Sequence, residues 1–231
     1  NSYPGNLELG LEREKLKILT ELIEDGFAVK PRIYRAGRYG FGTNTAVLLK
    51  EFGYRVDSSM VPGWSFAAQG GPDYRMMTSK PFWLDPEHTL LEIPISAALV
   101  GRAAQLNPTI SRHLFNGISE RFKIPAIMAR ANLLERIKLT PEGTTIDEAK
   151  RLVREMIVRG CKVFTLTYHS PSLEPGNTPY VKTSDDLQRF LAWLDEFFDF
   201  FISEIRGRPT TWEEVHASVS AGRLSSREQD S

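Results

Sequence analysis

The chain has 231 residues, of which 41% are hydrophobic and 25% charged, a composition typical of a soluble globular protein. Basic and acidic residues both number 29, so the net charge is zero and the sequence predicts neither nucleic acid nor an anionic membrane as a partner. No apolar run has the roughly 18 residues of a membrane span, and the single cysteine, Cys161, excludes an intrachain disulfide.

The first half of the chain alternates helical and strand patterns. Apolar residues at helical spacing predict a helix that stops at Gly26, and a second helix is expected between a Thr43 cap and Gly53. Strands are expected over residues 33–35, 54–57 and 90–95, and a long aromatic stretch rich in Pro and Gly separates the last two. Residues 97–123 are expected to be partly helical.

The second half repeats the alternation. A strand near residues 136–139 leads to a capping box from Thr145 to Glu148, which starts a helix ending at Gly160. The β-branched and aromatic run 163–168 is the strongest strand pattern in the sequence. The longest amphipathic helix is expected to begin near Thr183, a short helix near Thr211, and residues 223–231 are predicted to be a disordered tail.

This alternation predicts an α/β fold with a parallel sheet covered by helices, and both an open doubly wound sheet and a (β/α) barrel fit it. The sequence shows no repeat or linker, so one domain is expected over residues 1–222. Arg35, Asp57 and His169 stand at the C-terminal ends of predicted strands. Since barrel enzymes assemble their chemistry at that edge, these residues are the candidate catalytic groups.

Each candidate also has an ordinary structural explanation. His169 could act as a general acid or base near neutral pH, or simply bond a neighbouring carbonyl. Arg35 needs a polar partner if buried, which a structural ion pair would supply. Asp57 could orient a histidine, or cap the turn at Ser58. The aromatic loop containing Trp64 could stack on a sugar or pack down on the protein. Cys161 is expected to be packed rather than reactive.

Three segments, in this order, resemble motifs of the polysaccharide deacetylases with a NodB-homology domain. The segment Arg35-Ala36-Gly37-Arg38-Tyr39-Gly40 is similar to the arginine-bearing third motif of that family. Tyr54 to Ser59 is similar to the fourth motif, and Phe164 to Ser170 is similar to the fifth, a hydrophobic strand that ends in histidine. The variant with Arg-Ala-Gly and Asp-Ser-Ser resembles a bacterial subgroup from surface-polysaccharide gene clusters.

The resemblance implies a distorted (β/α) barrel, a divalent metal, usually zinc, and hydrolysis of the N-acetyl group of a carbohydrate. It implies that His169 protonates the leaving amine, that Asp57 orients His169, and that Arg35 holds an aspartate base by an ion pair. Tyr39, Trp64, Tyr168 and Ser170, which lie in or near these motifs or in the aromatic loop, are the expected substrate contacts.

The sequence departs from the family pattern before the third motif. Only 34 residues precede Arg35, and none is a histidine, so the family's metal ligands and base have no match. We therefore expect a barrel incomplete at its N-terminus, and no zinc binding or deacetylation by residues 1–231 alone.

Two alternatives stay open. One is a non-catalytic carbohydrate-binding or scaffold module on the same barrel. The other is a glycoside hydrolase that pairs Asp57 with Asp85, Glu87 or Glu92, although no spacing supports it. A cytoplasmic location is expected, and the sequence leaves the oligomeric state open.

Overall fold

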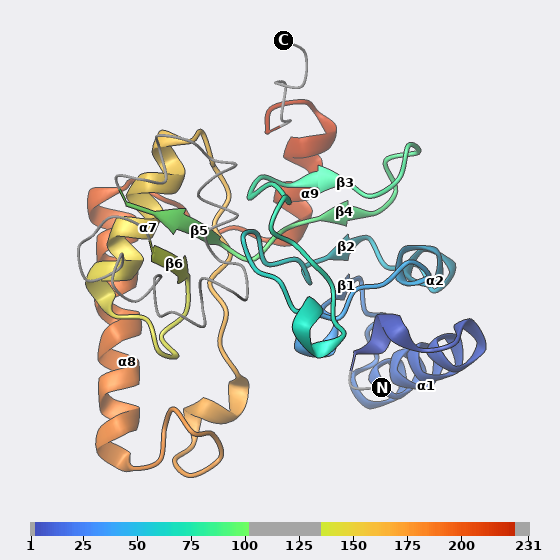
Figure 1. The fold of residues 1–231 in the computed structure, drawn as a ribbon, viewed down its shortest axis with the longest axis horizontal. Helices are drawn as coiled ribbons and strands as arrows, with labels where there is room; N and C mark the ends of the chain where they lie inside the picture. The colour runs from blue at the N-terminus through green and yellow to red at the C-terminus, as the bar shows by residue number, and fades with distance from the viewer. Residues whose placement is uncertain (1–2, 102–134, 225–231) are drawn as a thin grey trace. The chain divides into compact units, whose positions relative to one another are not determined.

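The structure is a computed structural model that describes residues 3–101 and 135–224. The chain divides into two compact units, Asn1–Pro94 with Thr211–Ser231, and Ile95–Thr210 (Figure 1). Because the two units are not placed relative to one another, each is described by itself. The prediction of one domain over residues 1–222 therefore stays a prediction, and most of the predicted disordered tail lies outside the described residues.

The first unit is built on a four-stranded sheet. Its strands are β1 (Ile33–Tyr34), β2 (Val56–Asp57), β3 (Phe82–Trp83) and β4 (Leu91–Glu92), in the order β1-β2-β4-β3. Strands β1, β2 and β4 are parallel to one another, and β3 is antiparallel to β4. The three predicted strands of this unit are confirmed in place, although each is only two residues long, and β3 arises inside the stretch expected to be loop.

Three α-helices belong to the first unit: α1 (Leu9–Phe27), α2 (Thr45–Glu51) and α9 (Trp212–Ser220). The first continues past Gly26 and ends at Ala28, which adopts a left-handed conformation with φ 53°. The second is preceded by Asn44 rather than Thr43, and the third begins after the predicted cap, Thr211. Short 3-10 turns cover η1 (Pro4–Asn6), η2 (Gly37–Tyr39) and η3 (Ala67–Gln69).

The core of the first unit is a small apolar cluster between helices and sheet. Its buried members are Leu16, Leu48, Leu49, Tyr54 and Leu90. The apolar stripe of α1 is only partly used, since Leu19 and Leu22 are exposed while Leu16 is buried. The parallel strands are held by α2 and by one face of α1, and this packing fixes the edge at which Arg35 and Asp57 emerge.

Among its described residues, the second unit contains an antiparallel pair of strands and two α-helices. Strands β5 (Ala97–Val100) and β6 (Glu135–Lys138) are antiparallel, and the helices are α7 (Ile146–Val158) and α8 (Ser184–Asp199), which continues as the π-helical turn η5 (Phe200–Glu204). Both predicted capping residues, Thr145 and Thr183, form complete capping boxes. Residues 97–100, at the start of the segment expected to be partly helical, form a fully buried strand. The rest of that segment, from residue 102, lies outside the described residues.

The strand predicted over residues 163–168 is not formed. The segment is extended, and Thr167 N–H donates to the carbonyl of Leu139 at 3.1 Å. Thr165 N–H, however, donates to the Ser96 hydroxyl at 2.7 Å rather than to a backbone carbonyl. A side-chain hydroxyl thus takes the place of a backbone carbonyl as the acceptor. No regular strand results, although the residues have high β-propensity.

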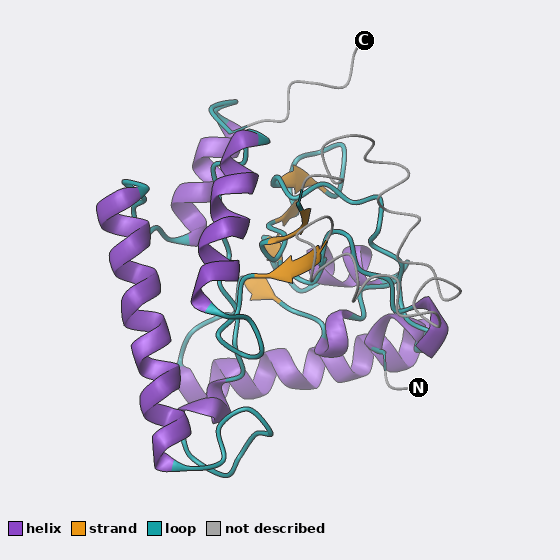
Figure 2. Cartoon of the chain, turned by 60° about the vertical axis from the view of Figure 1, so that its left-hand side comes forward, coloured by secondary structure: helices purple, strands orange, loops and turns teal. Residues whose placement is uncertain are grey.

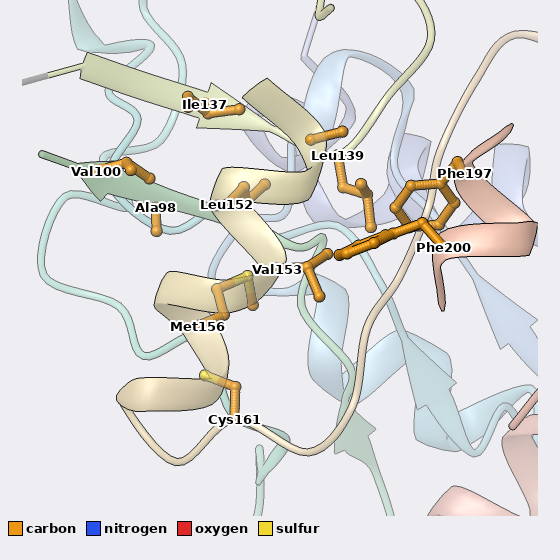
Figure 3. Packing of buried hydrophobic residues seen from close by; sticks show 11 residues of the cluster. Ala98, Val100, Ile137, Leu139, Leu152, Val153, Met156, Cys161, Phe197 and Phe200 are labelled. Atoms are coloured by element: carbon orange, nitrogen blue, oxygen red, sulfur yellow. The ribbon is translucent and has the colours of Figure 1, made fainter. Parts of the chain in front are cut away.

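The larger hydrophobic core lies in the second unit (Figure 3). Side chains from both strands and both helices meet there, among them Ile137, Leu152, Met156, Phe197 and Phe200. Cys161 is a buried member of this cluster, which agrees with the prediction that it is packed. The cluster packs β5, β6 and α7 against α8, and this packing supports the loops that carry Glu142 and His169.

The α/β architecture is confirmed, and helices and loops account for most of the described chain (Figure 2). Within the described residues the strands form two separate sheets and no closed barrel, so the barrel stays a prediction. No helix in the described part of the chain combines the length and apolarity of a membrane span. The cytoplasmic location also stays a prediction.

Candidate functional site

The three predicted catalytic residues are divided between the two units. Arg35 directly follows β1, and Asp57 ends β2, in the first unit. His169 lies in the second unit, immediately before the 3-10 turn η4 (Ser170–Leu173). The structure brings Arg35 and Asp57 to the same edge of one sheet. Their meeting with His169 stays a prediction.

Asp57 is fully buried at this edge and bonds to its own turn. Its Oδ1 accepts from the Ser59 hydroxyl at 2.6 Å, and its Oδ2 accepts from the Ser59 backbone N–H at 3.1 Å. The same hydroxyl accepts from Ala36 N–H at 2.8 Å, which ties the turn after β2 to the residue that follows Arg35. The alternative of a turn-capping aspartate therefore describes these contacts well.

Glu92 is a second fully buried acid beside Asp57, its register partner on β4. Its Oε1 accepts from Met60 N–H at 3.0 Å, whereas its Oε2 has no donor among the described residues. Burial and the negative charge of Asp57 raise the pKa of Glu92 well above its usual value, and burial also raises the pKa of Asp57. A proton on Glu92 would let its carboxyl donate to Asp57, because two ionised carboxylates can only repel.

Arg35 directs its guanidinium along the same edge. Nε donates to the carbonyl of Ser58 at 3.0 Å, and a terminal nitrogen donates to the hydroxyl of Ser58 at 3.1 Å. Burial lowers the pKa of Arg35, and the neighbouring charges of Asp57 and Glu92 counter this by raising it. The arginine thus partly compensates the buried acidic pair electrostatically.

Arg35 also lines a cavity of about 530 Å³. Its lining mixes charged and apolar groups, including Glu12, Lys15, Leu16 and Tyr34. Burial, followed by the charges of Asp57 and Glu12, raises the pKa of Tyr34 to about 12, so its phenol stays neutral at physiological pH.

His169 has a different environment in the second unit. Its side chain is 63% exposed, and its Nδ1 lies 2.7 Å from Oε2 of Glu142, whose side chain is only 4% exposed. A carboxylate other than Asp57 thus contacts the ring at Nδ1, and the orienting role expected of Asp57 stays a prediction. The contact with Glu142 is made at Nδ1, and Nε2 is the ring nitrogen that this carboxylate leaves open.

Glu142 also organises the loop around His169. Its Oε1 accepts from the backbone N–H of His169 at 3.0 Å and from the hydroxyl of the buried Ser172 at 2.6 Å. The Ser172 hydroxyl lies 2.9 Å from that of Thr178, and the ring of Tyr180 stacks on the imidazole at 6.1 Å between centroids. The loop from residue 169 to residue 180 is therefore folded around one buried carboxylate.

The four predicted substrate contacts differ in their exposure. Tyr39 has φ 61° and stacks on Phe66, and Trp64 is half-buried in the aromatic loop. Tyr168 is partly exposed and packs edge-on against Phe190, while Ser170 is exposed beside His169. Tyr168 and Ser170 thus flank the imidazole along the chain. Whether any of the four contacts a substrate stays a prediction.

The described ranges, 3–101 and 135–224, contain His, Cys, Asp and Glu side chains of the kinds that bind zinc. No three His, Cys, Asp or Glu side chains in those ranges gather as a metal site would require. The zinc that the family resemblance implies stays a prediction.

From the sequence alone, Glu92 carried little weight and Glu142 was not singled out. Glu92 entered only as a conceivable partner of Asp57 in a glycoside hydrolase. Its position beside Asp57 is now plain, but two fully buried acids cannot flank a sugar. Glu142 lies between Pro141 and Gly143, and an acid in such a turn is expected to face solvent. Nothing in the sequence therefore marked it as the partner of His169.

Neither a family model nor a curated protein matches this sequence. Among solved structures, the chain is similar to the crystal structure of a protein provisionally named a polysaccharide deacetylase, from Mycobacterium smegmatis. The two share 20% identity with a TM-score of 0.50, and the match covers 97% of this chain and 61% of the other. At this identity the likeness shows a related fold, and this chain spans less than two thirds of that protein.

Proposed function

We propose that this protein is a hydrolase that removes the acetyl group from N-acetylated sugars of a polysaccharide or oligosaccharide, with His169 as the proton donor. The observation that carries the proposal is the exposed imidazole of His169, held at Nδ1 by a buried carboxylate. Two further facts support it: the order of the three family motifs, and a fold similar to that of a protein named a polysaccharide deacetylase.

The reaction replaces the carbon–nitrogen bond of the acetamide with a carbon–oxygen bond from water. As the carbon–nitrogen bond breaks, its electron pair goes to the amine nitrogen, and that nitrogen takes a proton from Nε2 of His169. Acetate and a free amino sugar result, and the imidazole is left neutral with its Nδ1 proton directed at Glu142. A positioned general acid of this kind contributes about 10²–10⁴-fold to the rate.

Arg35 is proposed to hold the residue that removes the proton from water, and Asp57 to fix the sheet edge beside Arg35. The divalent metal implied by the family resemblance stays part of the proposal, with ligands other than the described residues. No step is derived through it.

The test is acetate release from an N-acetylated chito-oligosaccharide by the complete protein that carries this sequence, with zinc added. His169→Ala is expected to lower turnover by about 10²-fold or more, because the amine would leave without its proton donor. His88→Ala, an exposed histidine of the first unit, is the matched control and should leave turnover unchanged.

Unchanged turnover in His169→Ala, with circular dichroism showing an intact fold, would remove the proton-donor role. If the unaltered protein binds the oligosaccharide but releases no acetate, the non-catalytic carbohydrate-binding module is the better explanation.

A further inference from the structure

We infer that Glu142 is the positioning residue of His169, and that it fixes the imidazole as the tautomer protonated at Nδ1. The inference rests on the proposed function for its catalytic meaning, but the tautomer itself is a property of the chain. It adds a residue that lies outside the three family motifs, in the turn that follows β6.

The first support is the way Glu142 is buried and held. Its backbone N–H donates to the Thr140 hydroxyl at 3.2 Å, and Gly143, with φ 85°, completes the turn in a conformation that glycine adopts without strain. The turn that carries the carboxylate is therefore held in place. The imidazole takes the orientation that the carboxylate dictates.

The second support is the number of donors on this carboxylate. Two of its three partners do not belong to the imidazole: the backbone N–H of His169 and the hydroxyl of Ser172 both donate to Oε1. They leave Oε2 as the acceptor for Nδ1. A carboxylate oxygen accepts hydrogen bonds, so Oε2 faces Nδ1 as an acceptor.

The third support is the confinement of the ring. Tyr180 stacks on the imidazole with an interplanar angle of 12°, which hinders rotation of the ring away from Glu142. Nδ1 is therefore the inward nitrogen, and Nε2 is the atom from which a proton can reach a leaving amine. A neutral histidine free in water prefers the opposite tautomer, with the proton on Nε2, so the fold reverses the intrinsic preference.

The tautomer can be measured by long-range ¹H–¹⁵N NMR on the ¹⁵N-labelled 231-residue chain, at a pH high enough for neutral imidazoles. The four histidines are separated by a His169→Gln spectrum, from which one set of signals disappears. We expect the pattern of a proton on Nδ1 for His169. Glu142→Gln should shift it toward a proton on Nε2, because the amide can donate to Nδ1.

Glu174→Gln is the matched control, since Glu174 lies in the same loop and bonds to Asn177 rather than to the imidazole. It should leave the tautomer of His169 unchanged. A proton on Nε2 in the unaltered chain, or the same tautomer in Glu142→Gln as in the unaltered chain, would overturn the inference.

A turnover measurement separates this inference from the proposed function. In the complete protein, Glu142→Gln is expected to lower kcat by about 10–100-fold with little change in KM, as for other groups that orient a catalytic residue. If the NMR result holds but the unaltered protein releases no acetate, only the proposed function fails. If acetate is released and the tautomer is insensitive to Glu142, only the inference fails.

Discussion

Two buried glutamates, Glu92 and Glu142, show that burial alone does not decide what a carboxylate does in this protein. Glu92 lies in the first unit beside Asp57, with one donor on Oε1 and none on Oε2 among the described residues. Glu142 lies in the second unit and receives donors on both oxygens. The raised pKa of the first acid favours its protonated form, whereas the second acid accepts from several donors and contacts a histidine.

The difference follows from where each residue stands. A strand in the middle of a sheet offers its backbone groups to neighbouring strands, so Glu92 finds few donors and faces the acid in register with it. A turn exposes its side chain to a returning loop, and the loop after His169 supplies backbone and hydroxyl donors. The acidic pair is therefore suited to a structural role and Glu142 to a positioning role.

Replacing each glutamate by leucine is the strongest test of the difference between Glu92 and Glu142. Glu142→Leu removes the acceptor of the His169 and Ser172 donors and is expected to cost about 2–3 kcal/mol of stability in the second unit. Glu92→Leu removes one hydrogen bond but also the repulsion with Asp57, so its effect near neutral pH should be close to zero or stabilising. Urea unfolding, followed by hydrogen exchange within each unit, measures both.

Equal losses in the two leucine variants would contradict the distinction between the two acids. A loss confined to Glu92→Leu would reverse it.

The pH dependence of stability sharpens the comparison further. Since the folded pKa of Glu92 is raised, the folded state binds its proton more tightly than the unfolded state does. Stability contributed by that proton is complete below the unfolded pKa and declines as pH rises toward the folded pKa, by at most about 1.4 kcal/mol per pH unit for one proton. Glu92→Gln cannot ionise and should flatten the decline.

Thermal unfolding of both proteins from pH 4 to pH 9 checks this sign. Asp57 keeps its own raised pKa, so some slope should survive in Glu92→Gln. A steeper decline in that variant would refute the assignment of the proton to the pair.

The smallest expected effect comes from Thr145→Ala, which removes the capping box of α7 without touching the donors on Glu142. We expect a loss of about 1 kcal/mol in the second unit. Because the contacts of Glu142 are retained, the tautomer of His169 should be unchanged even though the unit is less stable. A change in tautomer would mean that His169 reports general stability rather than its contact with Glu142.

The sequence by itself determined the helices with strong local signals. The capping boxes at Thr145 and Thr183 and the cap at Thr211 depend on contacts within one turn, so short-range chemistry was sufficient. It also located the strands before Arg35 and up to Asp57, because polar residues interrupt the apolar pattern there.

Only the tertiary structure decided which groups meet. The donors of Glu142 come from residues 27 to 30 positions further along the chain, and Glu92 is joined to Asp57 by strand register. The run 163–168 failed as a strand because a serine hydroxyl, Ser96, took the place of a backbone acceptor. Such contacts depend on chain segments brought together by packing, and no local pattern encodes them. The exposed His169 was predictable from its place after an apolar run, whereas its partner Glu142 was not.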